Sequence, residues 1–363
     1  MRLVWARVNG VSLSADDIQE LSVALDDGSD GIALSYPALA GSCAPGDRVL
    51  LNTTAVGLDL GTGGKHFVVA VLGEGQGVAL DRPSGGHIMK LRYTPLQRDV
   101  LAVESPESPD HDAMQEARSL AGMPVVCCGL HSQVPLVAAA IKQANPALRV
   151  VYCMTDSASL ALPLSTVMRA AVSAKLVDAT ISCGQAFGGR YEAVNLHSGL
   201  LAARHVARAD AAIVAIGPGN VGTGTPYGHG GISQAEAINA VAVLAGSPVA
   251  VLRLSFADKR ERHRVVSHHT LAALGEITLA PAVVAVPTLP EECAERVRAA
   301  LEGAGICEKH RCVQAEAGSV PEPDLRGLCV TTMGRSVEDD PAFYSAAYAA
   351  GELAARIAAG ETL

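Results

Sequence analysis

The glycine-rich segment 217–231, with the sequence GPGNVGTGTPYGHGG, holds the densest group of residues in the chain that could do chemistry. Glycine tolerates positive φ and lets consecutive backbone amides converge on an anion. Thr223 and Thr225 add hydroxyl donors, and His229 adds a group that titrates near neutrality. We interpret the segment as an anion-binding loop, with a long surface turn as the alternative. Its predicted ligand-binding residues are Gly217, Gly219, Asn220, Gly222, Thr223, Gly224 and Thr225.

The start of this segment, residues 217–222, also matches the G-x-G-x-x-G fingerprint of dinucleotide-binding proteins. That fingerprint requires a helix to open within the motif and an acid about 20 residues further on. Here Pro226 delays the helix to about residue 232, and the next acid after the following strand, Asp258, is too distant. The sequence therefore argues against a nicotinamide cofactor and leaves any cofactor unknown.

Polar residues follow other apolar runs as well. His131 and Ser132 come after the first run and have the types of a general base and a nucleophile, although a helix cap is the favoured interpretation of Ser132. Ser132 and Gln133 are predicted ligand-binding residues. Gln133 adds a hydrogen-bonding group, and Asp156 supplies a carboxylate after the second run. The predicted catalytic residues are His131, Asp156 and His229.

Two further ligand-binding residues are predicted at later run ends, Gln185 and Arg335. The planar guanidinium of Arg335 suits a carboxylate or phosphate, with a structural salt bridge as the alternative. His263, His268 and His269 cluster in the sequence, but no acid or cysteine stands at a recognised ligand spacing, so the sequence predicts no metal site. The basic stretch 259–264 is interpreted as the solvated start of a helix, with an anion site as the alternative.

Beyond residue 112, apolar runs alternate with amphipathic segments, which is typical of an α/β domain. Strands that are apolar on both faces indicate a mostly parallel sheet covered by helices on both sides, with ligands at the carboxyl ends of the strands. The predicted strands are 125–129, 150–154, 179–183, 211–216, 249–254, 282–286 and 328–332.

Residues 1–104 instead show short segments with period-two alternation, broken by turns, which predicts a small β-barrel-like domain. The polar, proline-containing stretch 105–112 is the predicted linker, and 113–363 the α/β domain.

The composition limits the classes of partner. A formal charge of -9 without a basic run argues against nucleic acid, and no apolar segment is long enough to cross a membrane. No signal peptide is apparent, and scattered cysteines are typical of reduced thiols, so we expect a cytoplasmic protein. The expected partner is a small anionic ligand, and a homo-oligomer is left open.

The loop Asp59–Gly64 resembles the phosphate loop of actin-like sugar kinases and chaperone ATPases. The resemblance implies ATP binding through Asp59 and Thr62. That family has a second Asp-Gly-Gly phosphate element downstream, which this sequence lacks, and a glycine-rich hairpin is the alternative.

Five distinctive motifs occur together in this chain: NTTAV at 52–56, LGTGG at 60–64, GHIMKLRYT at 86–94, GLHSQ at 129–133 and the segment 217–231. Taken together, they resemble a family of uncharacterised bacterial proteins with a domain of unknown function, and the resemblance covers nearly the whole chain. It implies no activity, cofactor or catalytic residue.

Three functions follow from these patterns. The first is an enzyme acting on a small anionic or phosphorylated metabolite, with His131, Asp156 and His229 in acid/base roles. The second is a ligand-sensing protein without turnover, and the third is an actin-like ATPase acting through the loop 59–64.

Overall fold

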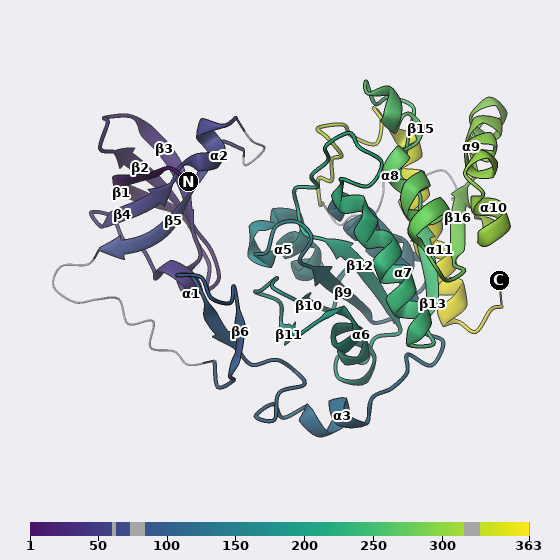
Figure 1. Cartoon of the computed structure of the whole chain (residues 1–363), viewed down its shortest axis with the longest axis horizontal. Helices are drawn as coiled ribbons and strands as arrows, with labels where there is room; N and C mark the ends of the chain where they lie inside the picture. Colours follow the sequence, from purple (N-terminus) through teal and green to yellow (C-terminus); the bar gives the residue numbers. More distant parts are fainter. Residues whose placement is uncertain (60–62, 73–83, 316–326, 363) are drawn as a thin grey trace. The chain divides into compact units, whose positions relative to one another are not determined.

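The computed structural model describes residues 1–59, 63–72, 84–315 and 327–362, and the chain divides into two compact units, Met1–Leu101 and Ala102–Leu363 (Figure 1). The stretch interpreted as a linker, 105–112, lies within the second unit. Ser105 and Ser108 are buried there, and the helix α3 begins at His111.

The first unit contains a closed barrel of five strands in the order β1-β2-β3-β5-β4, which confirms the predicted barrel. Side chains alternate between the barrel interior and solvent, so Ala6, Val8, Leu21, Val49 and Leu51 fill a small core. Closure leaves no unpaired edge in this sheet. The strands are β1 (Leu3–Ser14), β2 (Gln19–Leu25), β3 (Asp30–Ser35), β4 (Arg48–Asn52) and β5 (Lys65–Leu72).

The second unit is built on a sheet of eight strands, all parallel, in the order β11-β10-β9-β12-β8-β13-β16-β17. This confirms the predicted α/β fold. The strands are β8 (Pro124–Cys127), β9 (Val150–Thr155), β10 (Ala179–Cys183), β11 (Tyr191–Ala193), β12 (Ala211–Ile216), β13 (Ser247–Val251), β16 (Val283–Pro287) and β17 (Arg311–Ala315).

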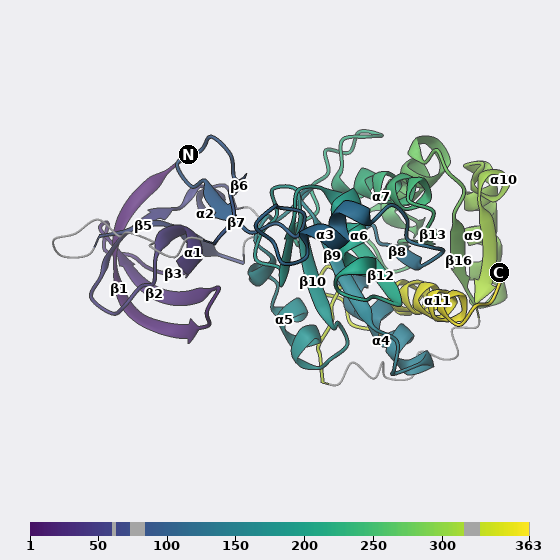
Figure 2. The same cartoon turned by 90° about the horizontal axis from the view of Figure 1, so that it is seen from below.

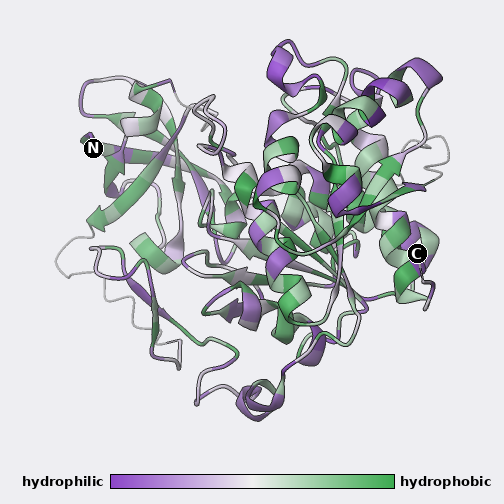
Figure 3. Cartoon of the chain, turned by 45° about the vertical axis from the view of Figure 1, so that its right-hand side comes forward, coloured by the Kyte–Doolittle hydropathy of each residue, from purple (hydrophilic) through white to green (hydrophobic). Residues whose placement is uncertain are grey.

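Helices cover both faces of this sheet because its central strands are buried on both sides. Alternate residues of β9 belong to opposite cores: Val151 packs with α6 (Leu196–His205) and α7 (Ser233–Val243), whereas Tyr152 packs with the opposite layer. That layer comprises α4 (Val134–Ala144), α5 (Thr166–Ser173) and α11 (Pro341–Ala358). Figure 2 shows α4 and α11 on one side of the sheet and α7 on the other. Figure 3, coloured by hydropathy, shows largely hydrophobic residues in the interior of the second unit. The remaining helices include α3 (His111–Glu116), α8 (His268–Leu271), α9 (Glu291–Gly303) and α10 (Ile306–Lys309).

The structure differs from the predicted strands in two respects: one predicted strand is absent, and the two edge strands of the sheet were not predicted. Residues 328–332 form no strand; they run as a loop, in which the buried Val330 accepts a hydrogen bond from the Tyr344 hydroxyl at 2.7 Å. The edge strands β11 and β17 are half-exposed and polar, so they lack the apolar run that identifies a central strand.

No helix in the part of the chain that the structure describes has the length and apolar character needed to cross a membrane.

The packing of α11 against α4 depends on Gly351. A Cβ at this position would lie 2.6 Å from both Ala140 Cβ and the Val137 carbonyl oxygen. We expect Gly351→Ala to destabilise the α/β unit by about 1–3 kcal/mol through overpacking, despite the higher helix propensity of alanine. Urea unfolding followed by far-UV circular dichroism measures this change, and fluorescence of the single tryptophan, Trp5, reports on the barrel separately.

The matched control is Gly303→Ala at the end of α9, where a Cβ would meet no atom within 4 Å. This variant should be neutral or more stable by up to about 1 kcal/mol. Equal unfolding midpoints for the two variants would contradict the packing interpretation.

Candidate functional site

A cavity of about 550 Å³ lies at the carboxyl ends of β8, β12 and β13 in the α/β unit. Its walls come from the loop after β8, the first part of the glycine-rich segment after β12, the start of α5, the segment 253–269 and the loop 329–333. The volume is that of a typical small-molecule site. The site thus occupies the edge at which ligands bind in open parallel sheets.

His131 is buried in the cavity wall, 8% exposed, and its Nε2 lies 2.7 Å from Ser165 Oγ. Its Nδ1 lies 3.2 Å from the Tyr152 hydroxyl and 3.3 Å from the carbonyl oxygen of Ile216. Because the Ile216 carbonyl oxygen can only accept, the contact with it assigns the ring proton to Nδ1, and the Tyr152 hydroxyl can accept from the same N–H while donating to a backbone carbonyl. Nε2 is then the acceptor of the Ser165 hydroxyl proton.

Burial lowers the pKa of His131 to about 4, although the Ile216 carbonyl opposes the shift. The imidazole is therefore neutral at pH 7, with the tautomer that a general base toward Ser165 requires. No carboxylate is hydrogen-bonded to this histidine within the described ranges, which distinguishes the pair from a full catalytic triad.

Ser165 also caps α5, accepting a hydrogen bond from Met168 N at 3.1 Å. It lines the cavity beside Thr166 and Val167, whose amides begin the helix. The sequence prediction missed Ser165, because a serine before a helix is ordinarily only a cap. Ser132, a predicted ligand-binding residue, lines the cavity too, but the hydroxyl that meets His131 belongs to Ser165.

The first part of the glycine-rich segment, from residue 217 to about 224, lines the cavity. The second part folds back into a hairpin. Thr223 and Thr225, predicted ligand donors, bond to each other at 2.9 Å and to Gly228 within a tight hairpin, away from the cavity. The residues of this segment that line the cavity are Gly217, Pro218, Gly219, Asn220, Val221, Gly222 and Gly224.

The Asn220 side chain lines the cavity, and its amide group makes no hydrogen bond within the described structure. Its Oδ1 and Nδ2 are both buried, and neither has a hydrogen-bond partner among the described residues. A buried amide without partners costs free energy, which a ligand offering both a donor and an acceptor would recover.

Arg253 is the most unusual charge in the cavity wall. It is 8% exposed, and no carboxylate pairs with it in the described part of the chain. Its Nη1 donates to His269 Nδ1 at 3.3 Å. Burial, and then repulsion from Arg260, lowers the pKa of Arg253 to about 10, so the guanidinium remains charged at pH 7. The sequence prediction missed this residue, although a single charge interrupting the apolar run 249–254 was a usable signal.

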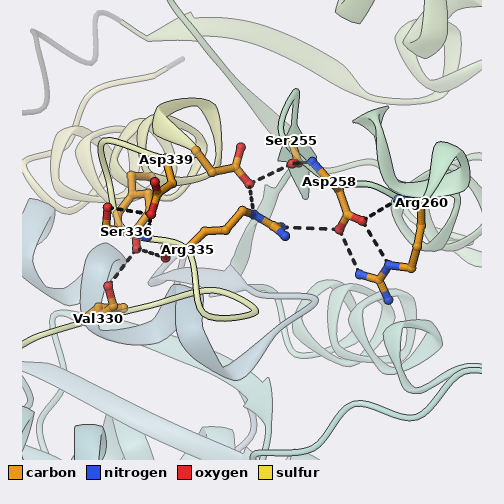
Figure 4. A network of polar contacts seen from close by, with 9 residues as sticks. Ser255, Asp258, Arg260, Val330, Arg335, Ser336 and Asp339 are labelled. Atoms are coloured by element: carbon orange, nitrogen blue, oxygen red, sulfur yellow. Dashed lines mark hydrogen bonds and ion pairs between the residues drawn. The ribbon is translucent and has the colours of Figure 1, made fainter.

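Arg260 and Arg262 also line the cavity, although the sequence favoured a solvated helix start for this stretch. Arg260 is held by two hydrogen bonds from its guanidinium to Asp258, at 3.0 and 2.8 Å, and this pairing holds the Asp258 pKa well below its usual range (Figure 4). Arg335, a predicted ligand-binding residue, lies outside the cavity lining and pairs with Asp340 at 3.0 Å and Asp258 at 3.4 Å. It serves the structural role that was its alternative interpretation.

Several predicted residues lie elsewhere. Asp156 is exposed, accepts a hydrogen bond from Gln185 N at 2.9 Å, and lies with Gln185 outside the cavity lining. Gln133 is fully buried and joins the backbone of Leu130 to that of Leu252. His229 belongs to the second part of the glycine-rich segment, lies outside the cavity lining and stacks on His269 with ring centroids 3.8 Å apart.

The loop 59–64 in the first unit is described only in part. Asp59, Gly63 and Gly64 have positive φ, as in a tight turn, whereas residues 60–62, including Thr62, lie outside the described residues.

Comparisons with known proteins place the chain in one family. A family model described as "Protein of unknown function (DUF3866)" matches residues 32–351. No curated protein and no solved structure matches the chain.

The low pKa of His131 makes stability depend on pH. Between the ordinary histidine pKa of 6.5 and about 4, the unfolded chain binds a proton that the folded chain does not. The free energy of unfolding should therefore fall as the pH falls through this window, by up to about 1.4 kcal/mol per pH unit for this residue. His131→Gln removes the titrating group and should flatten the dependence, measured by urea unfolding between these pH values. Exposed His197→Gln is the control, and equal slopes in both variants would refute the assignment.

Proposed function

The chain belongs to this family of proteins of unknown function, and we propose that it is an enzyme acting on a small anionic metabolite in the cavity of the α/β unit. Phosphorylated and carboxylated metabolites are the substrate classes that fit the lining. The proposal follows from the residues of this chain alone, since the family description names no activity.

The proposal rests chiefly on Arg253, whose buried guanidinium in the cavity wall has no carboxylate partner among the described residues. A buried charge that lacks an opposite charge is costly, and proteins normally pair it or use it to hold a ligand. Arg260 and Arg262 add positive charge to the same wall, and of these two only Arg260 has a carboxylate partner among the described residues, Asp258. An anion in the cavity would compensate this charge and accept hydrogen bonds from the planar guanidinium of Arg253.

The Ser165–His131 pair supplies the proposed chemistry. Ser165 Oγ attacks the electrophilic carbonyl carbon or phosphorus of the substrate while His131 Nε2 takes its proton. The bond from that carbon or phosphorus to the leaving group breaks, and the leaving group departs with the proton from His131. Water, which gives a proton to His131, then cleaves the ester formed on Ser165 and restores the serine. The Ile216 carbonyl, which accepts from Nδ1–H, holds the ring in the required orientation and stabilises the imidazolium that forms. The exposed Asp156 has no part in this step, and neither does His229.

Asn220 narrows the substrate class. Its Oδ1 can be satisfied only by a hydrogen-bond donor, which a bare phosphate dianion does not offer. We therefore expect a metabolite that carries a hydroxyl or amine beside its anionic group.

The anion site is tested with Arg253→Met, which keeps the apolar stem and removes the charge. Pyrophosphate, citrate and sugar phosphates are screened by thermal shift on the full chain. A ligand present at 100 times its Kd raises the free energy of unfolding of the wild-type chain by about 2.7 kcal/mol, which raises its Tm by several degrees. We expect this shift to disappear in Arg253→Met and to persist in the control Arg298→Met, which changes an exposed arginine on α9. An equal ligand shift in Arg253→Met and the wild type would rule out the proposed anion site.

The catalytic role of Ser165 is tested with Ser165→Ala, using the metabolites that pass the thermal-shift screen and following turnover by NMR. Loss of the nucleophile should lower the rate by about 10²–10⁴-fold or more. The control Asn195→Ala removes the equivalent cap from α6, so both variants should lose about 0.5–2 kcal/mol of stability while only the first loses turnover.

If the Ser165→Ala variant retains turnover, Ser165 is not the nucleophile, and its role is limited to capping α5. Binding without turnover in the wild type would favour the ligand-sensing alternative.

A further inference from the structure

Three histidines from two separate segments converge at the cavity wall, and one of them, His269, lines the cavity. His229 comes from the glycine-rich segment, whereas His268 and His269 begin α8. One ring nitrogen from each of the three lies within 4.8 Å of the others. The sequence spacing gave no sign of this group, because His229 is distant from the pair in the chain.

Two of the three histidines have a ring nitrogen that nothing in the described structure uses. His229 is 6% exposed, and its Nε2 donates to the carbonyl oxygen of Pro226 at 3.0 Å, so its proton is on Nε2. The lone pair of Nδ1 is then buried and free of partners, as is Nε2 of His268. A backbone carbonyl on the far nitrogen is the usual outer partner of a metal-binding histidine.

The backbone leaves space beside these nitrogens. A Cβ on Gly231 would lie 3.0 Å from His229 Nδ1, and a Cβ on Gly222 would lie 3.4 Å from His269 Nε2. Glycine at both positions keeps the ring edges uncovered, and Gly222 also lines the cavity.

The geometry points to a site for one divalent transition-metal ion, of the zinc, cobalt or nickel class, held by His229, His268 and His269. Three imidazoles with no carboxylate or thiolate form a neutral ligand set that suits these ions and not magnesium or calcium. Three protein ligands also leave a coordination position open, as in catalytic zinc sites. This inference does not depend on the proposed function.

Metal binding requires a defined rearrangement. The rings of His229 and His269 are stacked with an interplanar angle of 5°, and a metal lies in the plane of each ring that binds it, so one ring must turn. The hydrogen bond from Arg253 to His269 Nδ1 must also break. Ligation through Nδ1 uses the lone pair that accepts this bond, and ligation through Nε2 moves the ring proton to Nδ1.

Arg253 therefore competes with the metal for His269. Its positive charge, with those of Arg260 and Arg262, also opposes a cation, and Asp258 offsets only part of it. Removing Arg253 should tighten metal binding, whereas it should abolish anion binding. The two proposals thus make opposite predictions for one substitution.

The test uses the full chain, freed of metal with a chelator and titrated with Co²⁺ alone. We expect one ion per chain, with visible ligand-field bands and no sulfur-to-cobalt charge-transfer band. His268→Gln should weaken binding by more than about tenfold, because even the loss of an outer partner has that effect. Arg253→Met should strengthen it, and the exposed control His197→Gln should leave it unchanged.

The alternative ligands are Cys307 and Cys312, whose sulfurs lie 3.2 Å apart. Absence of binding in the wild type would overturn the proposal, as would a thiolate charge-transfer band that disappears in Cys307→Ser. If His268→Gln fails to fold, Gly231→Ala serves in its place, since its Cβ crowds His229 Nδ1 and should weaken binding too. Undiminished affinity in a folded His268→Gln or Gly231→Ala variant would also overturn it.

Discussion

The burial of the central strands on both faces is the constraint on which the rest of the α/β unit depends. Strands β8, β9 and β12 carry only buried residues, so polar chemistry can enter this unit only where the strands end. Two buried glutamines fix those ends relative to one another. Gln234 donates to the carbonyls of Cys127 and Val251, and Gln133 donates to that of Leu252. The loops around the cavity therefore start from a rigid frame.

Most of the fold could be predicted from the sequence because its main signals are local. The alternation in residues 1–72 and the apolar runs from 125 onward each identify an element by its own period. The edge strand β17 was missed because only its last residue, Ala315, is fully buried and Arg311 and Gln314 interrupt its apolar residues. The run 328–332 was misassigned because Leu328, Cys329 and Val330 are as apolar as a strand, although only Val330 and Thr332 of this loop are buried.

The site was predictable only in part, since contacts between distant segments have no signature in a single sequence. His131 and the first part of the glycine-rich loop were found because both directly follow strands. Ser165 and Arg253 were missed: the first is 34 residues from His131, and the second lies inside an apolar run. Asp156 satisfied the same positional rule as His131, yet its strand ends to one side of the cavity.

The pairing among Asp258, Arg260, Arg335 and Asp340 has a consequence for how this protein can change in evolution. Asp258 is 4% exposed and Asp340 1%, so loss of either arginine leaves a carboxylate buried with too little positive charge. Loss of an acid leaves a partly exposed guanidinium without that partner. Single changes are thus penalised more than compensated pairs, and these four positions should covary among relatives of this chain.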